Sequence, residues 1–358
     1  MKFAISIPIG SWNDFLPYTL ESLKAQQAET SIAFLDASGD PRVAALADKY
    51  NDMLDYRRHG PDKGQSDAII EGWDNTDGDF LGWLNADDSL FPSSLETVSR
   101  YLTGNPQLDL VYGHSSIIDE HDRMTGYHFN VQPPGDQLFE GCIISQPSCF
   151  FRRSTYDRVG GLKRELHYTM DWDLWLRLYT EGAKFGFIDQ LMSRVLWASD
   201  TKSASFNKGR RRELKDLIEK YTPDDLKRKI FKAFAIHAGA DMIWPAALRE
   251  KTTRWLRRGG QRMYGVRADG EISGNAQLNL VHYQSSPARG LLLTMDGNVG
   301  RLKIGPGPLI DKCAIRENQV HLEFAVPISL GEELRLELTV ADRTDNDPVF
   351  FKHAAWHF

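Results

Sequence analysis

The stretch FLGWLNADD, residues 80–88, is the most informative part of this sequence. Its first half is apolar enough for a buried strand, and it runs directly into Asn85, Asp87 and Asp88. A buried strand that ends in acidic side chains is typical of an open α/β sheet, where ligands bind at the carboxyl ends of the strands. We therefore predict a strand over this stretch and a ligand site at its end.

The neighbouring segments continue an alternation of strand and helix patterns. Leucines recur at helical spacing in residues 16–23, and the acidic and apolar run that begins at residue 171 is closed by Gly182. This alternation predicts an α/β layered domain over about the first 200 residues. The predicted strands are residues 3–9, 31–36 and 109–118, and the predicted helices lie around residues 16–23, 68–73 and 171–182.

Composition restricts the class of protein. The 358 residues carry a net charge of −6, with 41% hydrophobic and 26% charged residues, which is typical of a globular protein of two or three domains. The acidic balance argues against general nucleic-acid binding. Three cysteines cannot form a disulfide framework, which favours a reducing cytoplasm. No apolar run is long enough to span a bilayer, and the apolar start of the chain is interpreted as a strand rather than a signal peptide.

The sequence changes character twice after residue 200. Between Lys202 and Arg267 there are 18 Lys and Arg against 7 Asp and Glu, a net charge of +11, and the patterns are helical. From Gly265 onward, short alternating segments separated by Gly, Asn, Asp and Pro predict a small antiparallel sandwich. We therefore predict three parts: an α/β domain over residues 1–204, a helical basic segment over 205–263 and a β-sandwich-like accessory domain over 264–358.

The roles of the last two parts stay open at the level of sequence. Cations beside aromatic residues in 205–263 suit a helix on an anionic membrane surface, close to a lipid-linked acceptor. Alternatively, the apolar side of this segment packs on both domains and its cations are solvated. The tail could bind glycan, mediate self-association or brace the first domain; we favour assembly or support, with Trp356 and Phe358 closing its core.

Several carboxylates fall at predicted strand ends or in the loops that follow them. Asp36, Asp62 and the pair Asp87–Asp88 can converge on one crevice. Carboxylates in such a place can hold Mg²⁺ or Mn²⁺, which prefer oxygen ligands and bridge diphosphates. The alternative is that these residues occupy turns and helix N-caps, where Asp is common.

A second acidic pattern opens the predicted helix that starts at residue 171. Asp171 and Asp173 are two positions apart, so they do not share a helix face. One can cap the helix while the other faces a cleft and removes a proton from an acceptor hydroxyl. The alternative is an acidic first turn that the helix dipole stabilises. The GxGxxG, GxxxxGK[ST] and GxSxG motifs do not occur, which argues against dinucleotide-binding, P-loop and α/β-hydrolase functions.

Four long runs of the sequence share a pattern with a known family. The runs are DKGQSDAIIEGW (62–73), GDFLGWLNADDSLFPSSL (78–95), VYGHSSIIDEHDRMTGY (111–127) and SQPSCFFRRSTYDRVGGLKRELHYTMDWDLWLRL (145–178). They resemble the inverting family 2 glycosyltransferases, which have a GT-A fold, and the resemblance covers about residues 1–205. It implies an α/β GT-A domain, a nucleoside-diphosphate sugar donor, a divalent metal (Mn²⁺ or Mg²⁺), and transfer with inversion to a hydroxyl of a saccharide or lipid-linked saccharide in surface polysaccharide or lipopolysaccharide synthesis.

The resemblance also implies roles for single residues. Asp171 takes the place of the general base, and Asp87, together with Asp88, takes that of the metal ligands. Gln146 and Trp172 would lie near the sugar or the acceptor. The residues implied to line the nucleotide-sugar pocket are Pro8, Asp36, Asp62, Gln65, Asn85 and Asp87.

The sequence departs from the family pattern at three points. Ser11 and Asn85 stand where the family usually has Asn and Asp, and residues 196–205 lack the family's metal-reaching His. These departures leave a second hypothesis open, a scaffold that binds a nucleotide sugar or a glycan without turnover. A sugar nucleotidyltransferase is disfavoured because residues 9–17 contain no Lys or Arg. The donor sugar, the nucleotide base, the acceptor and the oligomeric state do not follow from the sequence.

Overall fold

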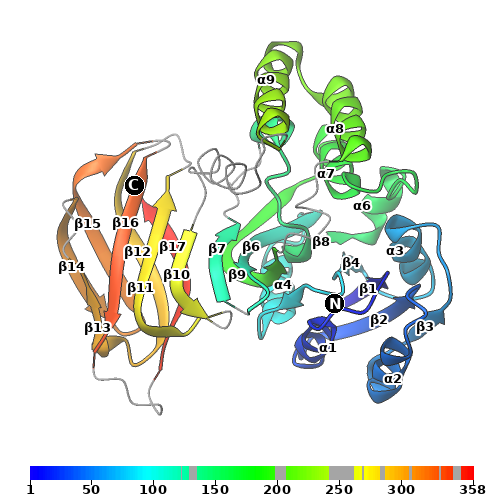
Figure 1. Ribbon diagram of the computed structural model, residues 1–358, viewed down its shortest axis with the longest axis horizontal. Coiled ribbons are helices and arrows are strands. Elements are labelled where there is room, and N and C mark those ends of the chain that lie inside the picture. The colour runs from blue at the N-terminus through cyan, green and yellow to red at the C-terminus, as the bar shows by residue number, and fades with distance from the viewer. Residues whose placement is uncertain are drawn as a thin grey trace.

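The computed structural model contains an α/β domain, a pair of helices and a β-sandwich (Figure 1). The sandwich lies at one end of the molecule and helices α1 to α3 lie at the other. The described residues are 1–121, 123–128, 135–197, 207–241, 262–267, 270–282, 287–305, 309–329, 332–341 and 348–358.

The α/β domain alternates strands and helices along the chain. It consists of β1 (Lys2–Ile9), α1 (Leu16–Lys24), β2 (Glu29–Asp36), α2 (Pro41–Lys49), β3 (Tyr56–His59), α3 (Gln65–Asp74), β4 (Phe80–Trp83), β5 (Ser89–Leu90), α4 (Ser94–Gly104), β6 (Leu110–Ile118), β7 (Arg123–His128), α5 (Gln137–Glu140), β8 (Cys149–Arg152), α6 (Arg153–Arg158), α7 (Met170–Thr180) and β9 (Phe185–Leu196). The rest comprises α8 (Lys208–Tyr221), α9 (Asp224–Asp241), β10 (Arg262–Arg267), β11 (Ile272–Val281), β12 (Ala288–Gly297), β13 (Leu302–Ile304), β14 (Ile310–Arg316), β15 (Gln319–Ile328), β16 (Glu333–Val340) and β17 (Val349–His357).

Strand β1 is the centre of the parallel part of the sheet. It pairs in parallel with β2 on one side and β4 on the other, and β3 extends the sheet beyond β2 in the same direction. In this register Ile9 lies opposite Asp36, and Asp36 lies opposite His59. Strands β8, β6 and β7 continue the sheet with antiparallel pairing, and β9 lies parallel to β6. The carboxyl ends of β1 to β4 therefore meet at one edge.

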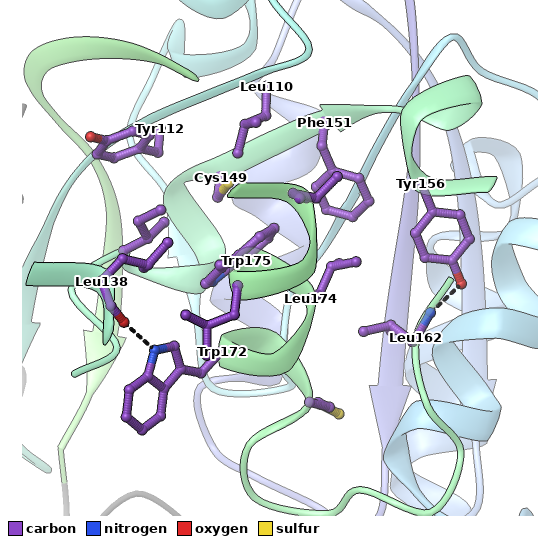
Figure 2. Packing of buried hydrophobic residues seen from close by; sticks show 14 of the residues in the cluster. Leu110, Tyr112, Leu138, Cys149, Phe151, Tyr156, Leu162, Trp172, Leu174 and Trp175 are labelled. Carbon is purple, nitrogen blue, oxygen red and sulfur yellow. Dashed lines mark hydrogen bonds between the residues drawn. The ribbon is translucent and has the colours of Figure 1, made fainter. Parts of the chain in front are cut away.

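Helices cover both faces of this sheet. Helices α1, α2 and α4 pack on one face through a cluster that includes Leu16, Val43 and Leu95. Helices α3, α7, α8 and α9 bury their apolar sides in a second cluster, which contains Trp73 and Trp175. Figure 2 shows part of this second cluster around α7. Burying apolar area on both sides of a sheet is the main source of stability for a layered domain.

Helix α3 lies unusually close to the sheet because Gly72 faces it. The hydroxyl of Ser6 donates a hydrogen bond to the carbonyl of Ile69 at 3.0 Å. A Cβ atom at position 72 would lie 2.9 Å from the Cβ of Ala33 and would also contact the Ser6 hydroxyl. This close approach fixes the first turn of α3 at the polar edge of the sheet.

The C-terminal strands form a sandwich that shares a sheet with the α/β domain. Strands β13, β16, β11 and β10 make one layer, and β14, β15, β12 and β17 make the other. Strand β10 also pairs with β7, with Val266 opposite Met124. Met124 is 1% exposed and belongs to the core of the sandwich. The predicted sandwich is confirmed. One of its two layers continues the sheet of the α/β domain through the pairing of β10 with β7.

Two expectations from the sequence are corrected by the structure, and part of a third lies outside the described residues. The strand predicted over residues 80–88 ends at Trp83, because the chain then turns and the N–H of Asp88 bonds to the carbonyl of Asn85 at 3.1 Å. Phe358 does not close the sandwich core, since it is 47% exposed, whereas Trp356 is 7% exposed. The described part of the basic segment forms α8 and α9, and residues 242–261, to which its helical pattern extends, lie outside the described residues.

The packing at Gly72 predicts a large effect for a single methyl group. Gly72→Ala should lower the free energy of unfolding by about 1–3 kcal/mol, because the Ala33 Cβ is fixed to a strand and cannot move away. The matched control is Gly104→Ala at the end of α4, where a Cβ meets nothing within 4 Å. That control should leave stability unchanged or raise it by up to about 1 kcal/mol. Urea unfolding of the three proteins measures both values, and equal stability of the two variants would contradict the packing argument.

Candidate active site

Asp36 ends β2 and is held by several donors. It is 3% exposed, and its Oδ1 accepts hydrogen bonds from the backbone N–H of Ser38 at 2.8 Å and from the Ser38 hydroxyl at 2.5 Å. Its Oδ2 lies 2.9 Å from Nδ1 of His59, at the end of the next strand. Asp36 therefore ties the turn after β2 to the end of β3 and has a fixed orientation at the sheet edge.

Arg58 connects Asp36 to the loop that precedes α3. Its guanidinium donates to the carbonyl of Asp36 at 3.3 Å and pairs with Asp62 at 3.4 Å and Glu71 at 3.1 Å. Asp62 in turn accepts a hydrogen bond from the N–H of Gly64 at 2.9 Å. Gly64 has a φ of +122°, a conformation that favours glycine, so the chain can turn sharply into α3.

A line of polar side chains then crosses from α3 to the end of β4. The side-chain amide of Gln65 donates to Oδ1 of Asn85 at 2.5 Å, and the Asn85 amide donates to Oδ2 of Asp88 at 2.8 Å. Asp88 is 3% exposed, and burial, together with the neighbouring charge of Asp87, raises the pKa of Asp88 well above its usual range. Asp87 itself is only half-buried. In this arrangement Asp88 orients Asn85, and Asp87 is the more exposed of the two carboxylates.

The donor set at this edge limits how a metal can bind. Among the residues that the structure describes, no three His, Cys, Asp or Glu side chains gather closely enough to hold a metal ion. Mg²⁺ commonly binds through one or two carboxylates together with substrate phosphates and waters. The half-buried Asp87 fits that mode, in which a diphosphate would supply further oxygens, and the described residues do not fit a closed cage of protein ligands.

Asp171 lies in the first turn of α7 and has the properties of a base. It is half-buried; its Oδ1 accepts the backbone N–H of Trp172 at 2.7 Å, and the thiol of Cys142 donates to its Oδ2 at 3.7 Å. Burial raises the pKa of Asp171, although these hydrogen bonds and the charge of Arg210 act in the opposite direction. A carboxylate with a raised pKa and access to solvent can accept a proton from a bound hydroxyl.

The start of α7 is joined to the start of α3. The hydroxyl of Ser66, next to Gln65, donates to the carbonyl of Leu166 at 2.9 Å and lies 2.8 Å from the sulfur of Met170. Met170 immediately precedes Asp171. The two helix starts are therefore neighbours, which brings the backbone at Asp171 near the start of α3, where Gln65 lies.

Comparison with known proteins identifies the domain that carries this edge. Residues 7–160 match the family described as Glycosyl transferase family 2. This part of the chain is a family 2 glycosyltransferase domain. A PGL/p-HBAD biosynthesis glycosyltransferase of Mycobacterium bovis is 26% identical over 186 residues, which are 51% of this chain and 71% of that protein. A glycosyltransferase of Rickettsia typhi is 24% identical over 218 residues, covering 56% of this chain and 66% of that protein.

A solved structure agrees with the fold of the glycosyltransferase domain. The crystal structure of S. aureus TarS 1-349 in complex with UDP-GlcNAc matches with a TM-score of 0.50 at 15% identity, covering 64% of this chain and 70% of that chain. At this identity the likeness concerns the fold alone. The predicted family and the GT-A-type α/β fold are both confirmed.

Two residues expected near the sugar or the acceptor lie mostly inside the α/β domain. Trp172 is 3% exposed, and its indole N–H donates to the carbonyl of Leu138 at 2.7 Å (Figure 2). This burial favours a structural role for Trp172, whose indole packs in the core next to Asp171 in the chain. Gln146 is 9% exposed, and its amide donates to the carbonyl of Trp83, the last residue of β4, at 2.7 Å. Pro8 is buried in β1, one residue before the sheet edge.

Several residues of this edge were not predicted from the sequence. His59 and Arg58 belong to a strand of only four residues, YRRH, which has no apolar alternation. Cys142 is one of the three cysteines, which the sequence predicts only not to form a disulfide framework. Its thiol contacts Asp171, and burial and that carboxylate raise the pKa of the thiol. The family's missing His falls in a run, 196–205, of which residues 198–205 lie outside the described part of the chain. Because YRRH lacks a strand pattern, the sequence contains no signal that could have found Arg58 and His59.

Asp173 has a different role from Asp171, as its position on another helix face predicts. It is 3% exposed and bonds to Nζ of Lys163 at 2.9 Å and to Nε of Arg177 at 2.7 Å. Burial opposes ionisation, but the hydrogen bond from Lys163 and the charge of Arg177 hold the pKa of Asp173 below its ordinary value. Asp173 is therefore a structural anion that ties α7 to the loop before it.

Removing this anion should lower stability in a pH-dependent way. Asp173→Asn leaves a buried Arg177 without its carboxylate, so the free energy of unfolding at pH 7 should fall by about 3 kcal/mol. Because the pKa of Asp173 is lower in the folded than in the unfolded chain, its contribution is complete above about pH 4 and is lost as the pH falls through the folded-state value. Urea unfolding from pH 7 downward should show the difference from wild type shrinking only at the acid end. Asp216→Asn, at an exposed position of α8, should show no such difference.

Proposed function

We propose that the chain is an inverting glycosyltransferase, of hexosyltransferase type, that moves a sugar from a nucleoside-diphosphate sugar to a hydroxyl of a saccharide or lipid-linked saccharide acceptor. Asp171 carries this proposal, because it is the half-buried carboxylate with a raised pKa beside the polar edge of the sheet. The family of the domain supports the reaction class. The finer statements about donor, metal and acceptor are part of the proposal.

The reaction needs a base on the acceptor side. Asp171 accepts the proton of the acceptor hydroxyl while that oxygen attacks the anomeric carbon from the face opposite the diphosphate. The new C–O bond forms as the bond from the anomeric carbon to the phosphate oxygen breaks, and the nucleoside diphosphate leaves with the electron pair. The N–H of Trp172 and the thiol of Cys142 keep the Asp171 carboxylate in one orientation for this step.

The donor side is proposed to use the line of polar residues at the sheet edge. Asp36 and Asp62 would bind the nucleoside, close to Pro8, and Gln65 and Asn85 would contact the diphosphate. Asp87 would hold a divalent cation, Mn²⁺ or Mg²⁺, which when bound offsets the charge that develops on the diphosphate. Asp88 would act through Asn85, to which it is hydrogen-bonded at 2.8 Å.

For the acceptor we propose surface polysaccharide or lipopolysaccharide synthesis on the cytoplasmic face of a membrane. The net charge of +11 between Lys202 and Arg267 supports attraction to an anionic surface. Leu214 and Ile218 of α8 are buried in the domain core, so such attraction would depend on the cations. Within the described residues, no helix has the length and hydropathy needed to cross a bilayer. For the sandwich we propose a supporting or assembly role, because it shares the sheet through β7 and β10.

Removal of the Asp87 carboxylate should abolish metal-dependent turnover. With UDP-, GDP- and dTDP-sugars as a panel, the wild type should release one nucleoside diphosphate slowly even without acceptor. Asp87→Ala should reduce that release about 100-fold or more, because the leaving diphosphate loses its countercharge. Asp77→Ala, at a side chain that is 94% exposed, is the matched control and should behave as wild type. Full activity of Asp87→Ala at saturating Mn²⁺ or Mg²⁺ would exclude the metal role.

Asp171→Asn should separate binding from turnover. The amide cannot take the acceptor proton, so we expect kcat to fall about 10²–10⁴-fold while the Kd for the donor stays within about twofold. In the wild type, the acid limb of the kcat/KM profile should lie above the usual aspartate value of about 4, because burial raises the pKa of Asp171. Calorimetric titration of the donor and initial rates between pH 4 and 9 measure the two effects.

The alternative function is a non-catalytic scaffold that binds a nucleotide sugar or a glycan. Donor binding without release of nucleoside diphosphate, with any metal or acceptor, would favour the scaffold. Asp171→Asn would then be indistinguishable from wild type in every assay. Turnover that is lost in Asp171→Asn would exclude the scaffold.

A further inference from the structure

We infer that Glu213 of α8 is a positioning residue for Asp171, so that the helix after the glycosyltransferase motifs takes part in building the active site. This inference rests on the proposed role of Asp171 as the base. It starts from one buried carboxylate. Glu213 is 8% exposed, although the residues before it in α8 are exposed or half-buried.

The Glu213 carboxylate binds the backbone that leads into α7. Its Oε1 accepts the N–H of His167 at 3.0 Å, and its Oε2 accepts the N–H of Tyr168 at 2.8 Å and that of Thr169 at 3.1 Å. The hydroxyl of Thr169 lies 3.2 Å from the same oxygen. A buried carboxylate is costly unless it is hydrogen-bonded, and here both oxygens are engaged.

These donors belong to the three residues that precede α7, and the N–H of Thr169 is among the first N–H groups for which a helix has no internal acceptor. Thr169 occupies the N-cap position, yet its side chain makes no capping hydrogen bond to α7. Its hydroxyl is directed to Glu213 instead. A negative charge in this place also interacts favourably with the helix dipole. Glu213 therefore stabilises the start of α7 from another helix, and Asp171 is the second residue of α7.

A second contact fixes the same two segments. Nδ2 of Asn207 donates to the hydroxyl of Tyr168 at 2.7 Å, while Oδ1 of Asn207 caps α8 by accepting the N–H of Arg210 at 3.0 Å. At the other end of α8, the hydroxyl of Tyr221 donates to Asp173 at 3.1 Å. Helix α8 thus holds α7 on both sides of Asp171, and Figure 1 shows the two helices adjacent.

The substitution Glu213→Gln tests this role with little change in volume. A glutamine amide would turn its NH₂ group toward at least one backbone N–H, so that donors face each other and the start of α7 shifts. A displacement of the base by about 1 Å can cost 10²-fold in rate. We expect kcat to fall about 10- to 100-fold with the KM for the donor unchanged within about twofold. Glu213→Asp, which keeps the charge, should recover part of the loss.

The matched control is Glu219→Gln on the same helix, where the side chain is 53% exposed and pairs with Lys215. It should leave kcat and KM unchanged.

A double-mutant cycle then separates positioning from general damage: in an Asp171→Asn background, Glu213→Gln should not lower the residual rate further, because its effect acts through Asp171. If Glu213→Gln does not fold, Thr169→Val, which removes one hydroxyl, should still lower kcat about 3- to 10-fold.

Specific results would overturn the inference. One such result is a wild-type kcat in folded Glu213→Gln or Thr169→Val. Another is a rise in the donor KM as large as the fall in kcat. A third is that Glu213→Gln lowers the rate of Asp171→Asn by the same factor as it lowers that of the wild type. If the wild type turns over no donor at all, the proposed function fails instead. The contact is then tested by amide hydrogen exchange, which Glu213→Gln should accelerate at residues 167–173 and Glu219→Gln should not. Unchanged exchange there would exclude the positioning role independently of activity.

Discussion

The geometry of this protein depends on the parallel pairing of β1 with both of its neighbours. Because Ile9 lies opposite Asp36 and Ser6 lies opposite Trp83, the polar residues that follow β2 and β4 emerge at one edge. A shift of one residue in this register would turn every side chain of β1 to the opposite face of the sheet. Gly72 then lets α3 approach the same strands, which brings the first turn of α3 to that edge.

The sequence predicts those parts of the site that depend on local order. Asp36 and Asn85 were predicted because they directly follow apolar strands, and Asp171 because it opens a helix. The contacts that orient them join residues far apart in the chain, 23 positions between Asp36 and His59 and 44 between Thr169 and Glu213. Hydrophobic periodicity carries no information about such pairs. It also fails for β14, which is exposed along almost its whole length and has no buried face to produce alternation.

The boundary between the glycosyltransferase domain and the sandwich illustrates the same limit. The change in composition near residue 265 predicts a change of structure there, and β10 begins at Arg262. It cannot predict that β10 pairs with β7, since nothing in either strand specifies an external partner. The pairing places Met124 in the sandwich core, and Leu191 of β9 packs against that core. The glycosyltransferase sheet therefore ends in a hydrophobic layer rather than at a free edge, which would otherwise be open to pairing with another chain.

Three carboxylates around α7 differ in their hydrogen-bond partners, and these partners determine whether each carboxylate stays a structural anion or can accept a proton. Asp173 meets two cations, so the pKa of this carboxyl is lowered and it stays an anion that holds the helix in place. Glu213 meets three backbone N–H groups and serves as a remote cap. Asp171 is stabilised by backbone N–H groups, a weak thiol donor and the charge of Arg210, but burial outweighs them and the pKa of Asp171 rises. A carboxylate that the protein stabilises incompletely keeps an affinity for protons. Asp173 and Glu213 hold α7 in place through their own hydrogen bonds, so Asp171 keeps its position without losing that affinity.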